Sequence, residues 1–304
     1  MTGVQGPVDI RRLPLPDALR HLREHGEPVD PRTDMDTESL QRRFPRLGAV
    51  TTRELTVQTP HGPQPARVYR DDTAVPSGRA LVWVHGGAFI GGYLDMPESH
   101  WVSLELAARG IPVFAVDYTK CLGDVHYPVP SDDVLAAWSY ARDHAVDLLG
   151  VDAGALHLGG ASAGGTLTAG ATARLRDGAG DLPAGLVLVY PAAHPDGTHP
   201  GQLPDPTAAH AQLSLNYAGS AEALADPHVF AGLGSGAGYP RTLVVVCELD
   251  GLRPSGEAFA GLLDAAGVDV TLHLEPGADH AHINEPADRT ALPTIEVIAD
   301  WMRA

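Results

Sequence analysis

The chain lacks the residues and segments that mark several large classes of protein. Cysteine stands at only two of the 304 positions, Cys121 and Cys247, which excludes a disulfide framework and leaves room for at most one bridge. No apolar run approaches the roughly 18 residues of a membrane span. The first 25 residues hold four arginines and lack the apolar region of a signal peptide. We therefore expect a soluble, cytoplasmic protein.

Positive charge is also scarce. Lysine and arginine number 21 against 38 aspartates and glutamates, so the formal net charge is −17. Because no basic patch offsets this charge, binding to nucleic acid or to an anionic membrane is disfavoured. The sequence has no Walker loop, no dinucleotide fingerprint and no dense group of metal ligands, so we expect neither a cofactor nor a metal. These absences favour a small-molecule partner and leave a homodimer open.

Apolar residues, by contrast, are plentiful. They make up 44% of the chain against 19% charged residues, which is enough for a large core. Six of eight predicted strands are separated by helices, which predicts an α/β fold with a mostly parallel sheet covered on both faces. The predicted strands are 53–59, 66–70, 80–84, 111–116, 155–158, 186–190, 242–247 and 268–274, and the predicted helices are 97–109, 132–149, 166–175, 254–266 and 286–303.

Two stretches break this alternation. Residues 1–48 are polar and contain two short helix patterns, at about 16–24 and 36–43, which are too short to fold alone and should lie on something else. Residues 191–239 are rich in proline and glycine, with one helix pattern at 209–217. A segment of this length inside a compact domain is either disordered or a functional lid.

The stretch from Gly159 to Gly165 joins an apolar strand to a helix of small residues. Its pattern, Gly160-x-Ser162-x-Gly164, is that of a nucleophile elbow. A serine held in a tight turn with unfavourable backbone angles needs neighbours without a Cβ two positions away. The turn lifts the serine hydroxyl above the sheet and points free N–H groups of the helix at it. In a chain with 34 glycines, an incidental serine in a glycine turn is the alternative.

A second glycine turn, His-Gly-Gly-Ala at 85–88, directly follows the apolar strand 80–84. Consecutive glycines let backbone N–H groups approach a ligand closely. Together with the N–H group of Ala163, those of Gly86 and Gly87 would form an oxyanion hole. An ordinary turn after a strand is the alternative, but the combination with the elbow pattern is more specific than either part.

A serine nucleophile needs a base, and the base needs an acid that orients it. Asp250 follows the strand 242–247, at the edge of the sheet where ligands gather, although an aspartate of a simple turn is the alternative. Glu248 is the competing carboxylate. The loop after the last strand offers His280 and His282, of which we favour His280 as the base and His282 as a pocket wall. A metal held by this pair is disfavoured, because no third ligand is evident.

These motifs, in this order, resemble those of the hormone-sensitive-lipase-like esterases, a group of α/β-hydrolases. Residues 85–88 match the family's His-Gly-Gly-Gly/Ala loop, and residues 160–165 match its Gly-Asp-Ser-Ala-Gly-Gly block. Residues 250–253, 276–280 and 116–118 are similar to its Asp-Pro-Leu-Arg, Pro-Gly-x-x-His-Gly-Phe and Val-Asp-Tyr motifs. The resemblance implies an α/β-hydrolase fold with an eight-stranded sheet and a small helical cap.

The resemblance also implies the division of the chain. The cap would combine the N-terminal helices of 1–48 with an insertion at about 191–239, and the catalytic domain would span 49–304. The departures from the family lie in the loops. Ala161 replaces an aspartate beside the nucleophile, and 119–124 replaces Arg-Leu-Ala-Pro-Glu, so the loop beneath the active site must be held differently. A phenylalanine of the family is replaced by His282.

The activity implied is that of a carboxylic ester hydrolase working through an acyl-enzyme. Ser162 would attack the ester carbonyl, His280 would take its proton, and Asp250 would hold the imidazole. Remote acids such as Glu54 and Glu105 are interpreted as surface charge. The residues expected to line the substrate pocket are Phe89, Tyr93, Tyr217, Leu252 and His282.

The insertion is unusually polar for an enzyme of long lipids, which favours short-chain or small polar esters. Its histidines are His194, His199, His210 and His228. The same triad could serve a lactonase, an acyltransferase or a cyclase of specialised metabolism, because fold alone does not separate these reactions. A non-catalytic ligand-binding protein is disfavoured, since all three triad residues are present.

Overall fold

The computed structural model describes residues 13–26, 36–195 and 209–304, which contain one eight-stranded sheet. Its strands lie in the order β1-β2-β4-β3-β5-β6-β7-β8. β2 is antiparallel to β1 and β4, and all other neighbours are parallel, which confirms the prediction of a mostly parallel α/β sheet. The strands are β1 (Thr51–Thr59), β2 (Gly62–Arg70), β3 (Ala80–Val84), β4 (Val113–Val116), β5 (Leu156–Ala161), β6 (Leu186–Val189), β7 (Thr242–Cys247) and β8 (Val270–Glu275).

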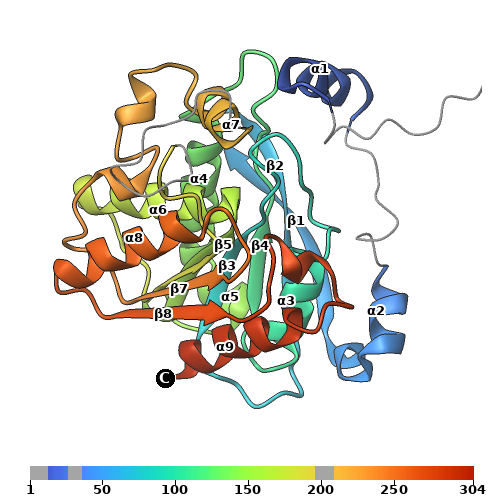
Figure 1. Ribbon diagram of the computed structural model, residues 1–304. Helices are drawn as coiled ribbons and strands as arrows, with labels where there is room; N and C mark the ends of the chain where they lie inside the picture. Colours follow the sequence, from blue (N-terminus) through green and yellow to red (C-terminus); the bar gives the residue numbers. More distant parts are fainter. Residues whose placement is uncertain (1–12, 27–35, 196–208) are drawn as a thin grey trace, which may run out of the picture.

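Helices cover both faces of the sheet (Figure 1). α3 and α9 pack on one face, whereas α4, α5, α6 and α8 pack on the other. Within the described ranges, no helix has the length and the apolar character needed to cross a lipid bilayer. The helices are α1 (Leu15–His25), α2 (Thr37–Arg43), α3 (His100–Ala107), α4 (Val129–Asp143), α5 (Ala145–Leu149), α6 (Ala163–Asp177), α7 (Ala209–Ala218), α8 (Arg253–Ala265) and α9 (Ala291–Arg303).

The central strand β3 explains why the sheet needs continuous apolar runs. All five residues of β3 are buried. Val82 and Val84 face the core under α4, α6 and α8, whereas Leu81 and Trp83 face the core under α3 and α9. Because side chains alternate between the two faces of a strand, a strand covered on both faces is apolar at every position. The polar residues that follow β3 therefore lie at the carboxyl edge of the sheet, where ligands bind in such folds.

One helix boundary shows how local polar contacts override a pattern. The predicted helix 286–303 begins only at Ala291. The side chain of Asp288 accepts a hydrogen bond from the N–H group of Thr290 at 2.7 Å and another from its hydroxyl group at 2.7 Å. Such an Asx turn offers the backbone an alternative to the helix. The helix therefore begins after this turn.

The two N-terminal helices lie on different parts of the molecule. α1 contacts α7, and Figure 1 shows the two near each other. α2 is capped by Asp36, whose carboxylate accepts a hydrogen bond from the N–H group of Ser39 at 2.7 Å. Phe44, which follows α2, stacks on Trp101 of α3 with 5.4 Å between the ring centroids. Thus α1 approaches the insertion at 191–239, whereas α2 is packed beside α3.

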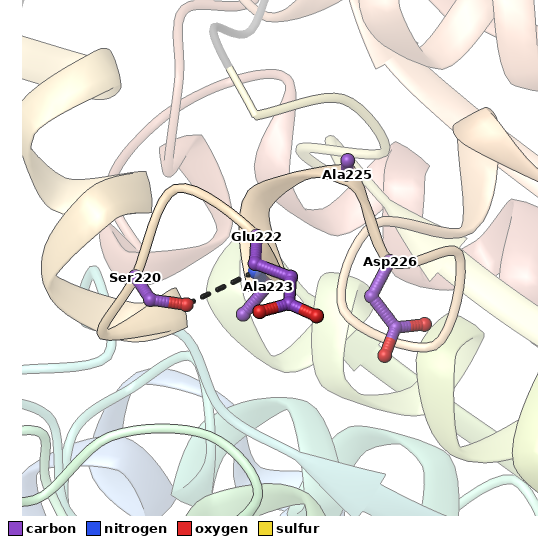
Figure 2. Close-up of a pocket in the computed structure, with 5 residues that line it drawn as sticks. All are labelled: Ser220, Glu222, Ala223, Ala225 and Asp226. Carbon is purple, nitrogen blue, oxygen red and sulfur yellow. Dashed lines mark hydrogen bonds between the residues drawn. The ribbon is translucent and has the colours of Figure 1, made fainter.

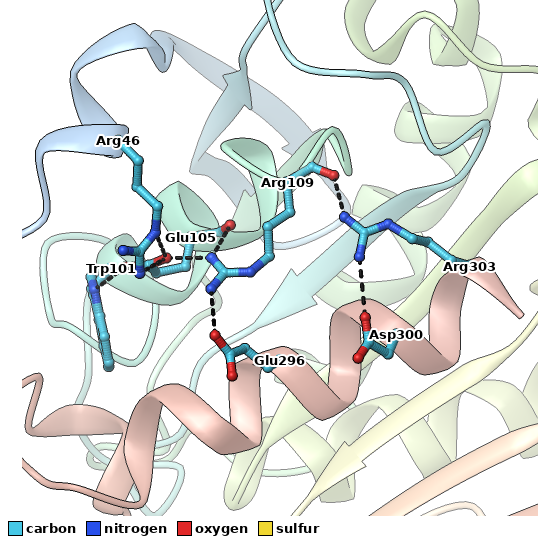
Figure 3. Close-up of polar contacts among 7 residues, drawn as sticks. All are labelled: Arg46, Trp101, Glu105, Arg109, Glu296, Asp300 and Arg303. Atoms are coloured by element: carbon cyan, nitrogen blue, oxygen red, sulfur yellow. Dashed lines mark hydrogen bonds and ion pairs between the residues drawn. The ribbon is translucent and has the colours of Figure 1, made fainter.

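Glu105 of α3 is fully buried, so its interpretation as surface charge is wrong. Its carboxylate accepts hydrogen bonds from Arg46 Nε at 2.9 Å and Trp101 Nε1 at 3.0 Å, and it forms an ion pair with Arg109 (Figure 3). Arg109 also reaches Glu296 of α9 at 3.2 Å. Every residue of α3 is buried, because this helix is covered on the side away from the sheet as well. The carboxylate therefore joins the segment around Arg46 to α3 and α9.

This arrangement predicts a large loss of stability on replacing Glu105. Removing one partner of a buried ion pair costs about 3–5 kcal/mol, and we expect Glu105→Ala to lie near the lower value because Arg46 can turn to solvent. Glu38→Ala breaks an exposed pair with Arg42 and should change the free energy of unfolding by about 0.5 kcal/mol or less. Urea unfolding of both variants measures the difference, and equal losses would contradict the assignment.

Candidate active site

Ser162 lies between β5 and α6 in a backbone conformation that few residues adopt. Its φ is 52° and its ψ is −120°. The turn is possible because two glycines approach other backbone atoms too closely for a side chain. A Cβ on Gly164 would lie 2.1 Å from the carbonyl oxygen of Val84, and a Cβ on Gly160 would lie 2.5 Å from the carbonyl group of Gly164. Strand, strained serine and helix thus form the geometry of a nucleophile elbow.

The structure brings the predicted nucleophile, base and acid together. Ser162 Oγ lies 2.9 Å from His280 Nε2, and His280 Nδ1 lies 2.8 Å from Asp250 Oδ2. With Nδ1 donating to the carboxylate, Nε2 of a neutral imidazole accepts the serine proton. Asp250 is buried, and its second oxygen accepts a hydrogen bond from the N–H group of Leu252 at 2.8 Å. Its position is therefore fixed by the start of α8.

The competing acid and the second histidine have other partners. Glu248 accepts a hydrogen bond from the N–H group of Gly277 at 2.7 Å. His282 is buried, with Nδ1 3.4 Å from Cys247 Sγ and Nε2 2.8 Å from Thr294 Oγ1. These contacts place His282 in the core, in contrast to the prediction that it lines the pocket. Both ring nitrogens of His282 therefore have partners outside the triad.

Charges around His280 favour its protonated form. Burial by itself lowers the pKa of His280, but the hydrogen bond to Asp250 and the charges of Asp250, Glu98 and Asp279 raise it above the ordinary value of 6.5. A raised pKa makes the imidazole a stronger base. It also stabilises the imidazolium that forms when Ser162 gives up its proton.

The glycine loop after β3 offers a different set of donors from the one predicted. The N–H group of Gly86 donates to the buried Glu98 Oε1 at 2.5 Å, which corrects its prediction as an oxyanion donor, because this N–H group already has a partner. The N–H groups of Gly87, Ala88 and Ala163 make no hydrogen bond within the part of the chain that the structure describes. These three groups are therefore the available donors. Sequence reasoning missed Ala88, although it is the fourth residue of the His-Gly-Gly-Ala motif.

Two residues beside the triad, Tyr190 and Glu98, belong to no motif, so the sequence alone does not predict a role for them. The hydroxyl group of Tyr190 donates to Glu98 Oε2 at 2.5 Å. The Tyr190 ring also lies against His280, with 4.9 Å between the ring centroids. Burial and the charge of Glu98 raise the pKa of Tyr190 well above its ordinary value, so its hydroxyl group stays a hydrogen-bond donor.

The loop beneath the site is held by a lysine. His85 Nε2 lies 2.9 Å from Asp117 Oδ1, and Lys120 Nζ forms an ion pair with the same carboxylate. Burial raises the pKa of Asp117, but the hydrogen bonds and charges of His85 and Lys120 outweigh it and hold that pKa well below its ordinary range. The hydroxyl group of Tyr118 donates to the carbonyl oxygen of Gly86 at 3.1 Å. This network supports the glycine loop where the chain departs from the family's Arg-Leu-Ala-Pro-Glu segment.

Two of the other residues predicted to line a pocket pack against each other. Phe89 and Tyr217 stack face to face, with 4.1 Å between their centroids and 4° between their planes. Both are buried, as is Leu252, whereas Tyr93 is half-buried. Their contact with a substrate stays a prediction.

Helix α7 brings one histidine of the insertion close to the triad. The stack of Tyr217 on Phe89 anchors the last turns of α7 to the segment after the glycine loop. Because positions seven apart share a helix face, His210 points to the same side as Tyr217. The side chain of His210 is exposed, but it interacts electrostatically with His280 and Asp250. Desolvation by the surrounding protein and the charge of His280 lower the pKa of His210, against the opposing effect of Asp250.

The other histidines of the insertion have structural partners or fall outside the described residues. His194 is buried with Nδ1 2.9 Å from Ser255 Oγ, and His228 Nε2 lies 2.9 Å from Asp177 Oδ2. His199 lies outside the described ranges. His210, by contrast, interacts electrostatically with two members of the triad, His280 and Asp250.

A surface hollow lies on the segment after α7 (Figure 2). Its lining includes no member of the hydrogen-bonded triad and no predicted pocket residue. We therefore do not assign the substrate to it. The lining residues are Ser220, Glu222, Ala223, Ala225 and Asp226.

The triad geometry predicts how labelling of Ser162 by a fluorophosphonate depends on pH. Labelling requires neutral His280, so the acidic limb of its rate profile follows the raised pKa of that imidazole. Asp250→Asn removes the stabilising charge, so the limb should move to lower pH while the plateau rate falls by up to about 10⁴-fold. Glu248→Gln is the control and should leave the profile in place. A shift in the control but not in Asp250→Asn would contradict the assignment.

Comparison with known proteins agrees with this geometry. Residues 81–284 match the family model described as the alpha/beta hydrolase fold. The chain is 32% identical to an ethyl acetate hydrolase of Pseudomonas putida over 77% of each chain. It is 30% identical to the carboxylesterase NlhH of Mycobacterium tuberculosis, over 72% of this chain and 71% of that protein.

A solved structure gives the same result in three dimensions. An esterase of Pyrobaculum calidifontis superposes with a TM-score of 0.73 at 26% identity, covering 91% of this chain and 98% of the other. The order of motifs, the fold and these relatives agree. The chain belongs to the α/β-hydrolase fold family, among the hormone-sensitive-lipase-like esterases.

Proposed function

We propose that this protein is a carboxylesterase that cleaves short-chain or small polar esters through an acyl-enzyme. The observation that carries the proposal is the continuous hydrogen-bonded chain from Ser162 through His280 to Asp250, set beside free backbone N–H groups. The names of the similar proteins, an ethyl acetate hydrolase and a carboxylesterase, support the same reaction class.

The first half-reaction forms the acyl-enzyme. Ser162 Oγ attacks the carbonyl carbon of the ester while His280 Nε2 takes the hydroxyl proton. Asp250 keeps Nδ1 protonated and stabilises the imidazolium. The tetrahedral intermediate then collapses, and His280 gives its proton to the leaving alcohol.

Backbone donors stabilise the negative charge of that intermediate. The N–H groups of Gly87, Ala88 and Ala163 serve as the oxyanion hole, and a well-placed donor contributes about 3–4 kcal/mol to the transition state. Ala163 is the first residue of α6, so the positive end of the helix dipole acts on the same oxygen. In the second half-reaction His280 activates water, which hydrolyses the acyl-enzyme.

The alternatives share this triad and differ in what accepts the acyl group. A lactonase, an acyltransferase or a cyclase would also form the acyl-enzyme at Ser162, whereas a ligand-binding protein would not. The net charge of −17 supports a small-molecule substrate rather than nucleic acid or an anionic membrane. A cytoplasmic location and a homodimer stay predictions.

Hydrolysis of 4-nitrophenyl acetate, butyrate and octanoate tests the proposal. The protein should hydrolyse the acetate and butyrate esters, and Ser162→Ala and His280→Ala should each lower kcat by at least about 10³-fold. His61→Ala, which removes a histidine on the β1–β2 turn, is the control and should keep full activity. A protein that is labelled at Ser162 but inert on all three esters would instead favour one of the acyl-transfer alternatives, and one that is not labelled would favour ligand binding.

The position of His210 predicts an effect on acyl-chain preference. His210→Leu replaces a polar imidazole near the triad with an apolar side chain, so kcat/KM for the octanoate ester should rise about tenfold relative to the acetate ester. Leu215→Ala changes an exposed residue on another face of α7 and should leave the ratio unchanged. An unchanged ratio in His210→Leu would show that this helix face does not meet the acyl chain.

A further inference from the structure

Glu98 is a buried acid that forms hydrogen bonds to several segments around the site. It lies in the loop before α3 and is 1% exposed. Its Oε1 accepts the hydrogen bond from Gly86 N–H at 2.5 Å, and its Oε2 accepts one from the Tyr190 hydroxyl group at 2.5 Å. Each oxygen therefore has a donor, which is the pattern that a carboxylate requires.

The backbone of Glu98 is tied down as well. Its N–H group donates to Asn284 Oδ1 at 3.0 Å, and its carbonyl oxygen accepts a hydrogen bond from Trp83 Nε1 at 2.9 Å. Trp83 belongs to β3, which leads into the glycine loop, and Asn284 closes the loop that begins with His280. Glu98 thus contacts both the strand that leads into the glycine loop and the loop that carries His280.

The carboxylate also lies close to the nucleophile. A Cβ added to Gly86 would meet Glu98 Oε1 at 2.6 Å and Ser162 Cβ at 3.0 Å. Gly86 is therefore packed between the acid and the serine. The carbonyl group of Gly86 shares one planar peptide with the N–H group of Gly87, and it accepts a hydrogen bond from the hydroxyl group of Tyr118 at 3.1 Å. With its N–H group held by Glu98 and its carbonyl group held by Tyr118, Gly86 is fixed on both sides, and so is the direction of the Gly87 N–H group.

We propose that Glu98 is a positioning residue, which clamps the oxyanion loop through Gly86 and couples it to the His280 side of the site through Tyr190. Glu98 touches no substrate. Its hydrogen bond to Gly86 holds the loop in place, so that the N–H groups of Gly87 and Ala88 stay directed at the oxyanion. The clamp rests on the proposed ester hydrolysis, since it acts through the oxyanion hole of that reaction.

The charge of the clamp reaches the base as well. Glu98 is among the acids that raise the pKa of His280, so its removal should lower that pKa. The titratable groups that face His280 from the packed elements are Asp250, Asp279, Glu98, Tyr190, His210 and His282. Of these groups in the described part of the chain, Glu98 also forms a hydrogen bond to the oxyanion loop, through the N–H group of Gly86.

Two substitutions separate the hydrogen bond from the charge. In Glu98→Gln the amide oxygen can still accept from Gly86 and the amide nitrogen can face Tyr190, so kcat should stay within about tenfold of the unmodified protein. The acidic limb of kcat/KM should move to lower pH by about 0.5 to 1 pH unit, because the charge is gone. In Glu98→Ala the clamp is lost, and kcat for 4-nitrophenyl acetate should fall about 10²-fold with KM changed less than about threefold.

Glu105→Ala is the matched control, because it removes another buried glutamate of the same region away from the triad. It should lose stability but keep kcat per active site, counted by fluorophosphonate labelling of Ser162. A Glu98→Ala protein whose kcat per labelled site is within about twofold of the unmodified protein overturns the proposal. If Glu98→Ala does not fold, an unmoved pH limb in Glu98→Gln overturns it.

Failure of the proposed function can be told apart from failure of the clamp. If the unmodified protein labels at Ser162 but hydrolyses no ester, the rate of labelling becomes the measurement, and Glu98→Ala should slow it about 10²-fold because labelling also needs the oxyanion hole. An unchanged labelling rate would overturn the clamp. If Ser162 is not labelled at all, both the esterase function and the clamp are overturned.

Discussion

The close approach of α6 to the end of β3 is the constraint on which the site depends. Gly164 comes so near the carbonyl oxygen of Val84 that no side chain fits between them. This contact fixes the first turn of α6, and with it the strained backbone of Ser162 and the direction of the Ala163 N–H group. The glycine loop after β3 begins at the same contact. One backbone contact therefore sets the distance between Ser162 and the N–H groups of the glycine loop.

Around this contact lie buried or half-buried carboxylates with defined hydrogen-bond partners. Asp250 has His280 and the start of α8, Glu98 has Gly86 and Tyr190, and Asp117 has His85 and Lys120. A buried carboxylate without donors would be costly, so each of these acids requires its surroundings to stay in place. The same requirement gives the site rigidity. The loops of the active site are thus held by polar contacts as much as by apolar packing.

How far the sequence could predict the site depended on whether a feature is local. The elbow, the order of strands and helices and the choice of Asp250 and His280 follow from short patterns and from where strands end. The partners of Glu98 lie 12, 92 and 186 positions away, so no local pattern could reveal them. The sequence does not reveal that Glu105 is buried, because its partner Arg46 is 59 positions away and α3 is covered on both sides. It does not reveal either that the N–H group of Gly86 already donates to Glu98, which leaves Gly86 unable to act as the predicted oxyanion donor. The role of His282 was likewise decided by Cys247 and Thr294, contacts across elements.

The stack of Tyr217 on Phe89 joins α7 to the segment that follows the His-Gly-Gly-Ala loop. Here a change in the packing of α7 reaches the segment after the glycine loop through two parallel rings. The two rings fill one buried contact, so a substitution of Tyr217 and a substitution of Phe89 should have coupled rather than additive effects on stability.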